Sequence, residues 1–201
     1  MAAGTKANLR NELLAARRAV PEALHRAESE KLCAHLATAV SLSSGHTAGT
    51  VCAYYPVSSE PGSPEMLDVL ARLGPAVLLP VARKGSDDSH LPLQWGRYAP
   101  GRLSPGLFGL REPTEPWLPA SAIATADIVL VPALAVDRRG VRLGRGGGFY
   151  DRSLPLCPPG TRLIAVVRDC EILGELPRDP HDVAMTHALT PGGGLIRLGE
   201  C

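Results

Sequence analysis

The most chemically informative part of the sequence is the segment 130–154, which reads LVPALAVDRRGVRLGRGGGFYDRSL. The segment contains four closely spaced glycines, Gly144, Gly146, Gly147 and Gly148. Because glycine has no side-chain bulk, the backbone N–H groups there can approach an anion closely. Arg142 and Arg145 stand among them and can add positive charge. Two rings and an acid follow directly: Phe149, Tyr150 and Asp151. A bare triple glycine is more often a flexible loop or hairpin corner, but this context favours a phosphate-binding loop.

The loop matches none of the common nucleotide-binding fingerprints. It is not a Walker A loop, because no Gly-Lys-Ser or Gly-Lys-Thr follows the glycines. The dinucleotide fingerprint is disfavoured as well, because no acid stands at a second strand end about 20 residues later. An arginine-glycine RNA-binding tail would be disordered and extended, whereas this loop is embedded between apolar segments.

Three cations near the amino end form a second candidate site. Lys6, Arg10 and Arg17 are four and seven residues apart, and at about 100° per residue they fall on one narrow strip of a helix. The apolar spacing predicts that helix over 5–18, with Thr5 as its N-cap. Such a strip is either a solvated charged face or an anion-binding surface, and spacing alone favours the solvated face.

The elements that must position these residues alternate between helical and extended patterns. Pro21 suits the first turn of a helix that runs to about residue 40, and Ser-Pro-Glu at 63–65 starts another helix that Gly74 ends. Short apolar runs without clean alternation predict strands covered on both faces; they are 50–55, 76–81, 127–132 and 162–168. Residues 83–120 are dense in Gly, Pro and charge and are expected to form long loops, with a candidate short strand at 93–95.

This alternation predicts an open α/β structure: a mainly parallel sheet in three layers, with helices on both faces, in a single domain spanning 1–201. Ligand sites in such sheets lie at the carboxyl ends of the strands. Tyr55 and Glu60 follow the first strand in the segment YYPVSSE and are therefore candidates for such a site. A surface glutamate after a turn is an equally good interpretation of Glu60. Four aromatic residues between 83 and 120 could stack on a ligand or pack in the core; they are Trp95, Tyr98, Phe108 and Trp117.

Composition excludes several classes of protein. The chain has 45% hydrophobic and 20% charged residues with a formal net charge of +1, which is unlike a polyelectrolyte binder of nucleic acid. No apolar run approaches the roughly 18 residues that a membrane span needs, and the start MAAGTKANLR lacks an apolar signal core. We therefore expect a cytoplasmic protein with neither a membrane nor a nucleic-acid partner. We also expect a monomer, although the net charge neither favours nor excludes association.

The segment RLGRGGGFYDRSL, preceded by VPALAVDRRG, resembles the signature of the 5-formyltetrahydrofolate cyclo-ligase family, also called methenyltetrahydrofolate synthetases. Other segments extend the resemblance over nearly the whole chain: Lys-x-x-Leu-Arg at 6–10, YYPVSSE, LLPVA and the late PRDPHDVAMTHALT. The resemblance implies a cyclo-ligase or NagB-like open sheet. It also implies an ATP-dependent closure of 5-formyltetrahydrofolate, with or without a polyglutamate tail, to 5,10-methenyltetrahydrofolate, with Mg²⁺ as cofactor and ADP and phosphate as further products.

The resemblance also implies roles for individual residues. ATP would be bound by Lys6, Arg10, Arg142, Leu143, Gly144, Arg145, Gly146, Gly147, Gly148, Phe149 and Tyr150. Arg145, Lys6 and Arg10 would act in catalysis by neutralising the transferring phosphate, whereas Arg17 is expected at the surface. The folate would contact Tyr55, Glu60, Arg145, Gly148 and Phe149. Mg²⁺ would be held by Asp151 and Asp182, although an aspartate placed like Asp182 is more often a cap or turn residue.

Two alternatives come from other classes of protein. A sugar-phosphate isomerase or an acyl-CoA transferase-like protein would use a similar open sheet, and fold alone does not separate them. The basic amino-terminal helix together with the glycine-rich loop fits a triphosphate better than a sugar phosphate. A regulatory module that binds nucleotide or folate without turnover is the non-catalytic alternative.

Overall fold

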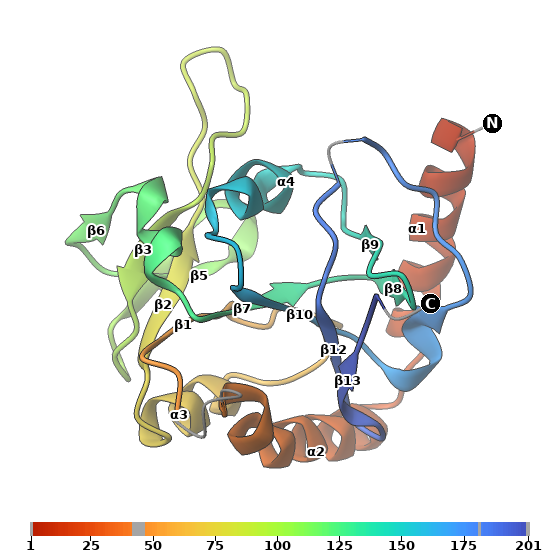
Figure 1. Cartoon of the computed structure of the whole chain (residues 1–201), viewed down its shortest axis with the longest axis horizontal. Coiled ribbons are helices and arrows are strands. Elements are labelled where there is room, and N and C mark those ends of the chain that lie inside the picture. Colours follow the sequence, from red (N-terminus) through yellow and green to blue (C-terminus); the bar gives the residue numbers. More distant parts are fainter. Residues whose placement is uncertain (1, 42–46, 181, 200–201) are drawn as a thin grey trace.

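The computed structural model describes residues 2–41, 47–180 and 182–199. Its centre is an eight-stranded sheet in the order β13-β12-β10-β7-β1-β2-β3-β6 (Figure 1). Five consecutive strands are parallel to one another: β12 (His187–Thr190), β10 (Arg162–Val166), β7 (Ile128–Pro132), β1 (Thr50–Cys52) and β2 (Ala76–Val81). Antiparallel strands complete the edges: β13 (Gly194–Arg197), β3 (Gln94–Arg97) and β6 (Trp117–Leu118).

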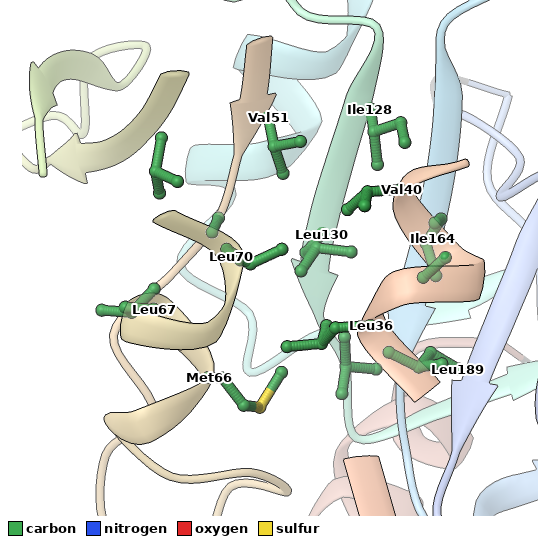
Figure 2. Close-up of a cluster of buried hydrophobic side chains, with 14 of the residues drawn as sticks. Leu36, Val40, Val51, Met66, Leu67, Leu70, Ile128, Leu130, Ile164 and Leu189 are labelled. Carbon is green, nitrogen blue, oxygen red and sulfur yellow. The ribbon is translucent and has the colours of Figure 1, made fainter. Parts of the chain in front are cut away.

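The inner strands are apolar on both faces, which explains why the sequence shows apolar runs without alternation. In β7, Ile128 and Leu130 face one hydrophobic cluster, whereas Val129 and Val131 face another. The first cluster lies under α2 (Glu22–Val40) and α3 (Glu65–Arg72), whose Leu36, Met66, Leu67 and Leu70 pack against the strands (Figure 2). The predicted helices and the parallel sheet are therefore confirmed.

The opposite face of the sheet is covered by short helices. These are η2 (Ala120–Thr125), α4 (Phe149–Ser153) and η3 (Leu154–Leu156), and they contribute Ile123 and Leu154 to the second cluster. Helical segments thus lie on both faces, as predicted for a mainly parallel α/β sheet, but only one face carries long helices (Figure 1).

Helix α1 (Ala2–Arg18) packs away from the large sheet. Its Leu9 and Leu13 contact a small cluster over the three-stranded sheet of β11 (Ile172–Leu173), β8 (Ala135–Asp137) and β9 (Arg142–Leu143). The predicted N-cap at Thr5 is wrong, because the helix begins at Ala2 and Thr5 lies within its first turns.

The region 83–120 contains more structure than predicted. Besides β3 and β6 it holds a hairpin of β4 (Leu103–Pro105) and β5 (Arg111–Pro113), joined through η1 (Leu107–Gly109).

A further short helix, η4 (Asp169–Glu171), follows β10. No helix within the described ranges is long and apolar enough to cross a membrane.

Candidate active site

A cavity of about 350 Å³ lies at the carboxyl ends of the central strands. Tyr54, Tyr55 and Glu60 line it after β1, Ala82 lines it after β2, and residues 132–134 line it at the end of β7. Chain order reverses here, because β1 has β2 on one side and β7 on the other. Open α/β sheets bind ligands at such a switch point, so the predicted position of Tyr55 and Glu60 is explained by topology.

The glycine-rich loop forms one wall of the cavity, with Gly144, Gly146, Gly147 and Gly148 among its lining residues. The loop connects β9 to α4. Gly146 and Gly148 have φ values of +96° and +70°, a conformation that side chains with a Cβ rarely adopt. Glycine is therefore required at these two positions by the course of the backbone.

A hairpin over residues 83–91 projects from the molecule beside α4 (Figure 1), and its residue His90 contacts this loop. His90 Nδ1 lies 2.6 Å from the carbonyl oxygen of Gly147, and the His90 ring stacks on Phe149 with 4.3 Å between ring centroids. The glycine loop is thus held from a segment more than 50 residues away in sequence.

Helix α1 meets the same loop through its cationic strip. Arg10 Nε donates a 2.9 Å hydrogen bond to the carbonyl oxygen of Gly144. One turn earlier, Lys6 Nζ lies 2.6 Å from an oxygen of Asp179 and 3.2 Å from one of Asp182. Burial lowers the pKa of Lys6, but the hydrogen bonds to both aspartates outweigh it and the net shift is upward. Lys6 therefore joins α1 to the segment before β12.

An ion pair links the glycine loop to the loop after β1. Arg145 Nε lies 3.2 Å from Glu60 Oε1, and Glu60 Oε2 accepts a hydrogen bond from the backbone N–H of Val57. The Glu60 side chain is 10% exposed and that of Arg145 is 47% exposed. Burial raises the pKa of Glu60 above its ordinary value, although the Val57 N–H and Arg145 oppose this shift. A candidate folate residue and a candidate phosphate residue thus contact each other.

The two candidate metal ligands occupy different surroundings. Asp151 lines the cavity and pairs with Arg142. Asp182 pairs with Lys6 and accepts a hydrogen bond from the backbone N–H of Asp179, and it is not among the residues that line the cavity. Within the described ranges no group of three or more His, Cys, Asp or Glu side chains could enclose a metal ion. A carboxylate beside a glycine-rich loop with free approach for phosphate would still suit Mg²⁺, which commonly takes one or two carboxylates together with phosphate oxygens and water.

Most of the candidate residues come together. Those that line the cavity are Tyr55, Glu60, Arg142, Gly144, Arg145, Gly146, Gly147, Gly148, Phe149, Tyr150 and Asp151. Leu143 is instead buried in the small cluster beneath α1. Lys6 and Arg10 both lie outside the lining. Arg10 contacts the glycine loop, whereas Lys6 pairs with Asp179 and Asp182.

Other residues of the site were missed or misassigned. Arg17 was expected at the surface, which is wrong: it is 3% exposed and lines the cavity. Its guanidinium bonds both carboxylate oxygens of Glu171 at 2.7 Å and the carbonyl oxygen of Ala133 at 2.6 Å. The heptad-like spacing from Arg10 was the only sequence signal of its inward orientation. His90 and Arg111 also line the cavity and carried no signal.

Of the four aromatic residues of 83–120, the three whose side chains the structure describes do not line the cavity. Trp95 is fully buried in the core, the Tyr98 hydroxyl donates to Asp68, and Trp117 lies beneath the guanidinium of Arg83. The Phe108 side chain lies outside the described part of the chain. For Trp95 the core interpretation is therefore confirmed.

Comparison with known proteins identifies the family. Residues 2–191 match the sequence profile of the 5-formyltetrahydrofolate cyclo-ligase family. The chain belongs to this family. It is thus an enzyme of the cyclo-ligase class, as the resemblance of the glycine-rich segment implied. Membership also favours the ligase over the sugar-phosphate isomerase alternative.

The similarity to individual cyclo-ligases extends over the chain. A 5-formyltetrahydrofolate cyclo-ligase from Mycolicibacterium smegmatis is 55% identical over 198 residues, which cover 98% of this chain and all of that protein. One from Escherichia coli is 28% identical over 145 residues, 72% of this chain and 79% of that protein. The solution structure of a 5,10-methenyltetrahydrofolate synthetase from Aquifex aeolicus matches with a TM-score of 0.77 at 27% identity, covering 98% and 94% of the two chains. A synthetase from Mycoplasma pneumoniae shares the fold, with a TM-score of 0.66 at 20% identity over 90% and 94% of the chains.

Proposed function

We propose that this cyclo-ligase converts 5-formyltetrahydrofolate to 5,10-methenyltetrahydrofolate with consumption of ATP and release of ADP and phosphate. The observation that supports this most strongly is the chemical contrast between the walls of one cavity. A glycine loop with two arginines forms one wall, and a carboxylate with aromatic and apolar side chains forms the other. Such a cavity suits a polyanion next to a flat heterocycle.

The triphosphate would lie against the glycine loop. Backbone N–H groups at 144–148 can approach phosphate oxygens closely, and Arg145 is half-exposed beside them. The Arg10 guanidinium lies over Gly146, with Cζ 3.6 Å from the position of a Cβ there. A side chain at residue 146 would therefore meet this cation, whereas glycine leaves it accessible. Lys6, one turn earlier on α1, adds a further cation.

The pteridine would lie on the side of Glu60. Its carboxylate can accept hydrogen bonds from the exocyclic amine and ring N–H groups of a pterin. Tyr55, Phe149 and Leu93 supply ring and apolar surface to the same cavity. Gly148 also lines the cavity, and because it has no side chain, its backbone can approach both the nucleotide and the folate.

The reaction then follows from positioning. The formyl oxygen on N5 attacks the γ-phosphorus in line, the bond from phosphorus to the bridging oxygen breaks, and ADP leaves. N10 adds to the activated formyl carbon and loses its proton, and phosphate departs with the former formyl oxygen. Arg145, Arg10 and Lys6 would stabilise the charge that spreads over the transferring phosphoryl group, which is the main task in phosphoryl transfer.

Mg²⁺ would be held by Asp151 together with phosphate oxygens and water. When bound, it supplies charge neutralisation of the β- and γ-phosphates. Asp182 pairs with Lys6, so its binding to Mg²⁺ would compete with this ion pair.

The test is to follow the absorbance of methenyltetrahydrofolate formed from 5-formyltetrahydrofolate, with and without ATP. Product that depends on ATP is expected. A folded protein that binds ATP but forms no product would instead favour the regulatory-module alternative. Thermal stabilisation by ATP with Mg²⁺, but not by sugar phosphates, is expected in parallel.

A further inference from the structure

Four arginines within the described ranges line the cavity, and one of them differs from the rest. Arg17 is paired with Glu171, Arg142 with Asp151, and Arg145 with Glu60. No described residue forms an ion pair or side-chain hydrogen bond with the guanidinium of Arg111. A cation that lines a binding cavity without a protein carboxylate is suited to an anionic group on the ligand.

The strand that carries Arg111 is firmly anchored. The next residue, Glu112, is 3% exposed. Its Oε1 accepts a 2.8 Å hydrogen bond from the backbone N–H of Ala82, and its Oε2 a 2.9 Å bond from Arg83. Gly106 gives this side chain room, because a Cβ there would lie 2.4 Å from Glu112.

Successive side chains on a strand point to opposite faces. Because the Glu112 side chain points inward and binds the backbone just after β2, the Arg111 side chain points to the opposite face of the strand. Arg111 is exposed as well as cavity-lining, which places it where the cavity opens to solvent.

The neighbours of Arg111 show which ligand group it would meet. The adjacent Leu110 and the lining residues Leu93 and Pro80 are apolar. They come from a segment of the chain separate from the glycine loop, and they give the cavity an apolar surface in addition to the Arg111 cation. Such a lining suits a ligand that is flat and apolar in its middle and anionic at one end. In 5-formyltetrahydrofolate an aminobenzoyl ring leads to a glutamate with free carboxylates.

We propose that Arg111 binds a carboxylate of the substrate's glutamyl tail and so makes the enzyme prefer glutamylated folates. This inference depends on the proposed function. The planar guanidinium can bind a carboxylate through two parallel hydrogen bonds. Because the site is open to solvent, the contribution is modest and weakens as ionic strength rises.

The experiment measures equilibrium binding of two ligands: 5-formyltetrahydrofolate and 5-formyltetrahydropteroate, which lacks the glutamate. Arg111→Ala is expected to weaken binding of the glutamylated ligand about 5- to 10-fold and to leave binding of the pteroate unchanged. Arg102→Ala is the matched control, because Arg102 is exposed near the same hairpin and does not line the cavity. It should bind both ligands as the wild type does.

Equal weakening of both ligands, or of neither, would overturn the proposal. A weakened affinity for ATP alone would show that Arg111 contacts phosphate and would overturn it too. Binding is measured apart from turnover, so a wild-type enzyme that binds the folate without converting it would reject the proposed reaction and not the Arg111 contact.

Discussion

Replacing Glu171 by Gln tests the buried ion pair under the cavity. The carboxylate accepts two hydrogen bonds of 2.7 Å from Arg17 and one of 2.8 Å from the backbone N–H of Arg168. The side chains of Glu171 and Arg17 are 5% and 2% exposed. Glu171→Gln therefore leaves the Arg17 cation buried without a counter-charge.

Breaking a buried pair by removing one partner costs about 3 to 5 kcal/mol. The lower end is expected here, because Gln keeps one oxygen that can accept from Arg17. For a chain of 201 residues, a loss of about 3 kcal/mol corresponds to a Tm lower by about 6 to 12 °C.

Urea and thermal unfolding followed by circular dichroism measure this loss. Glu175→Gln is the control, since Glu175 has 76% side-chain exposure and pairs with the half-exposed Arg139; it should unfold close to the wild type. A double Arg17→Met and Glu171→Leu variant should recover part of the stability, because neither charge remains buried. If Glu171→Gln unfolds like Glu175→Gln, the reasoning about an uncompensated Arg17 is refuted.

Three further predictions concern the cavity. Arg145→Ala should lower kcat by about 10²-fold or more if Arg145 stabilises the transferring phosphate as proposed. The exposed Arg138 lies outside the cavity, so Arg138→Ala should leave kcat unchanged; unaltered kinetics in a folded Arg145 variant would reject the proposed role. Burial raises the pKa of Glu60, so its contribution to the free energy of unfolding is fully present below its unfolded pKa near 4.5 and is lost as pH rises through the folded value. Glu60→Gln should therefore gain stability relative to wild type between pH 4.5 and 7 in urea titrations, and a constant difference would contradict the raised pKa. Gly148→Ala places a Cβ on a residue of the glycine loop with a φ of +70° and should weaken ATP binding several-fold. Gly160 has a φ of +95° and open space around it, so Gly160→Ala should lower Tm without changing ATP affinity; equal ATP affinities of the two variants would show that the loop tolerates the change.

The central sheet could be predicted because its strands carry their own signal. The prediction for 76–81 matches β2 at both ends, since strands buried on both faces read as unbroken apolar runs. The first strand was predicted to reach Tyr55 but ends at Cys52. Beyond that point the chain turns to line the cavity, and residue type alone does not mark the change.

The small sheet beneath α1 could not be predicted. Strands β9 and β11 have two residues each, which is too short for any periodicity to show. Their pairing is decided by contacts between segments distant in sequence. The hairpin of β4 and β5 could not be predicted either, because contacts of the buried Glu112 with a distant segment hold it in place.

The site was predicted in outline but not in its pairings. The glycine loop, Arg145 and Glu60 were found from residue types and the family resemblance, and the cavity brings them together. The ion pair between Lys6 and Asp179 joins residues 173 positions apart, and no local sequence pattern indicates such a pairing. The sequence does not distinguish a buried arginine from an exposed one, and the burial of Arg17 follows from its ion pair with the distant Glu171.

The contact between Arg145 and Glu60 makes the two halves of the cavity interdependent. A ligand that engaged either side chain would separate the pair and release the other side chain, so that the second ligand would meet a residue that is already available. In the proposed reaction this would give positive heterotropic cooperativity between nucleotide and folate, equal in size whichever arrives first. A pocket occupied by one reactant alone would then be the less populated state, which would protect ATP from wasteful hydrolysis.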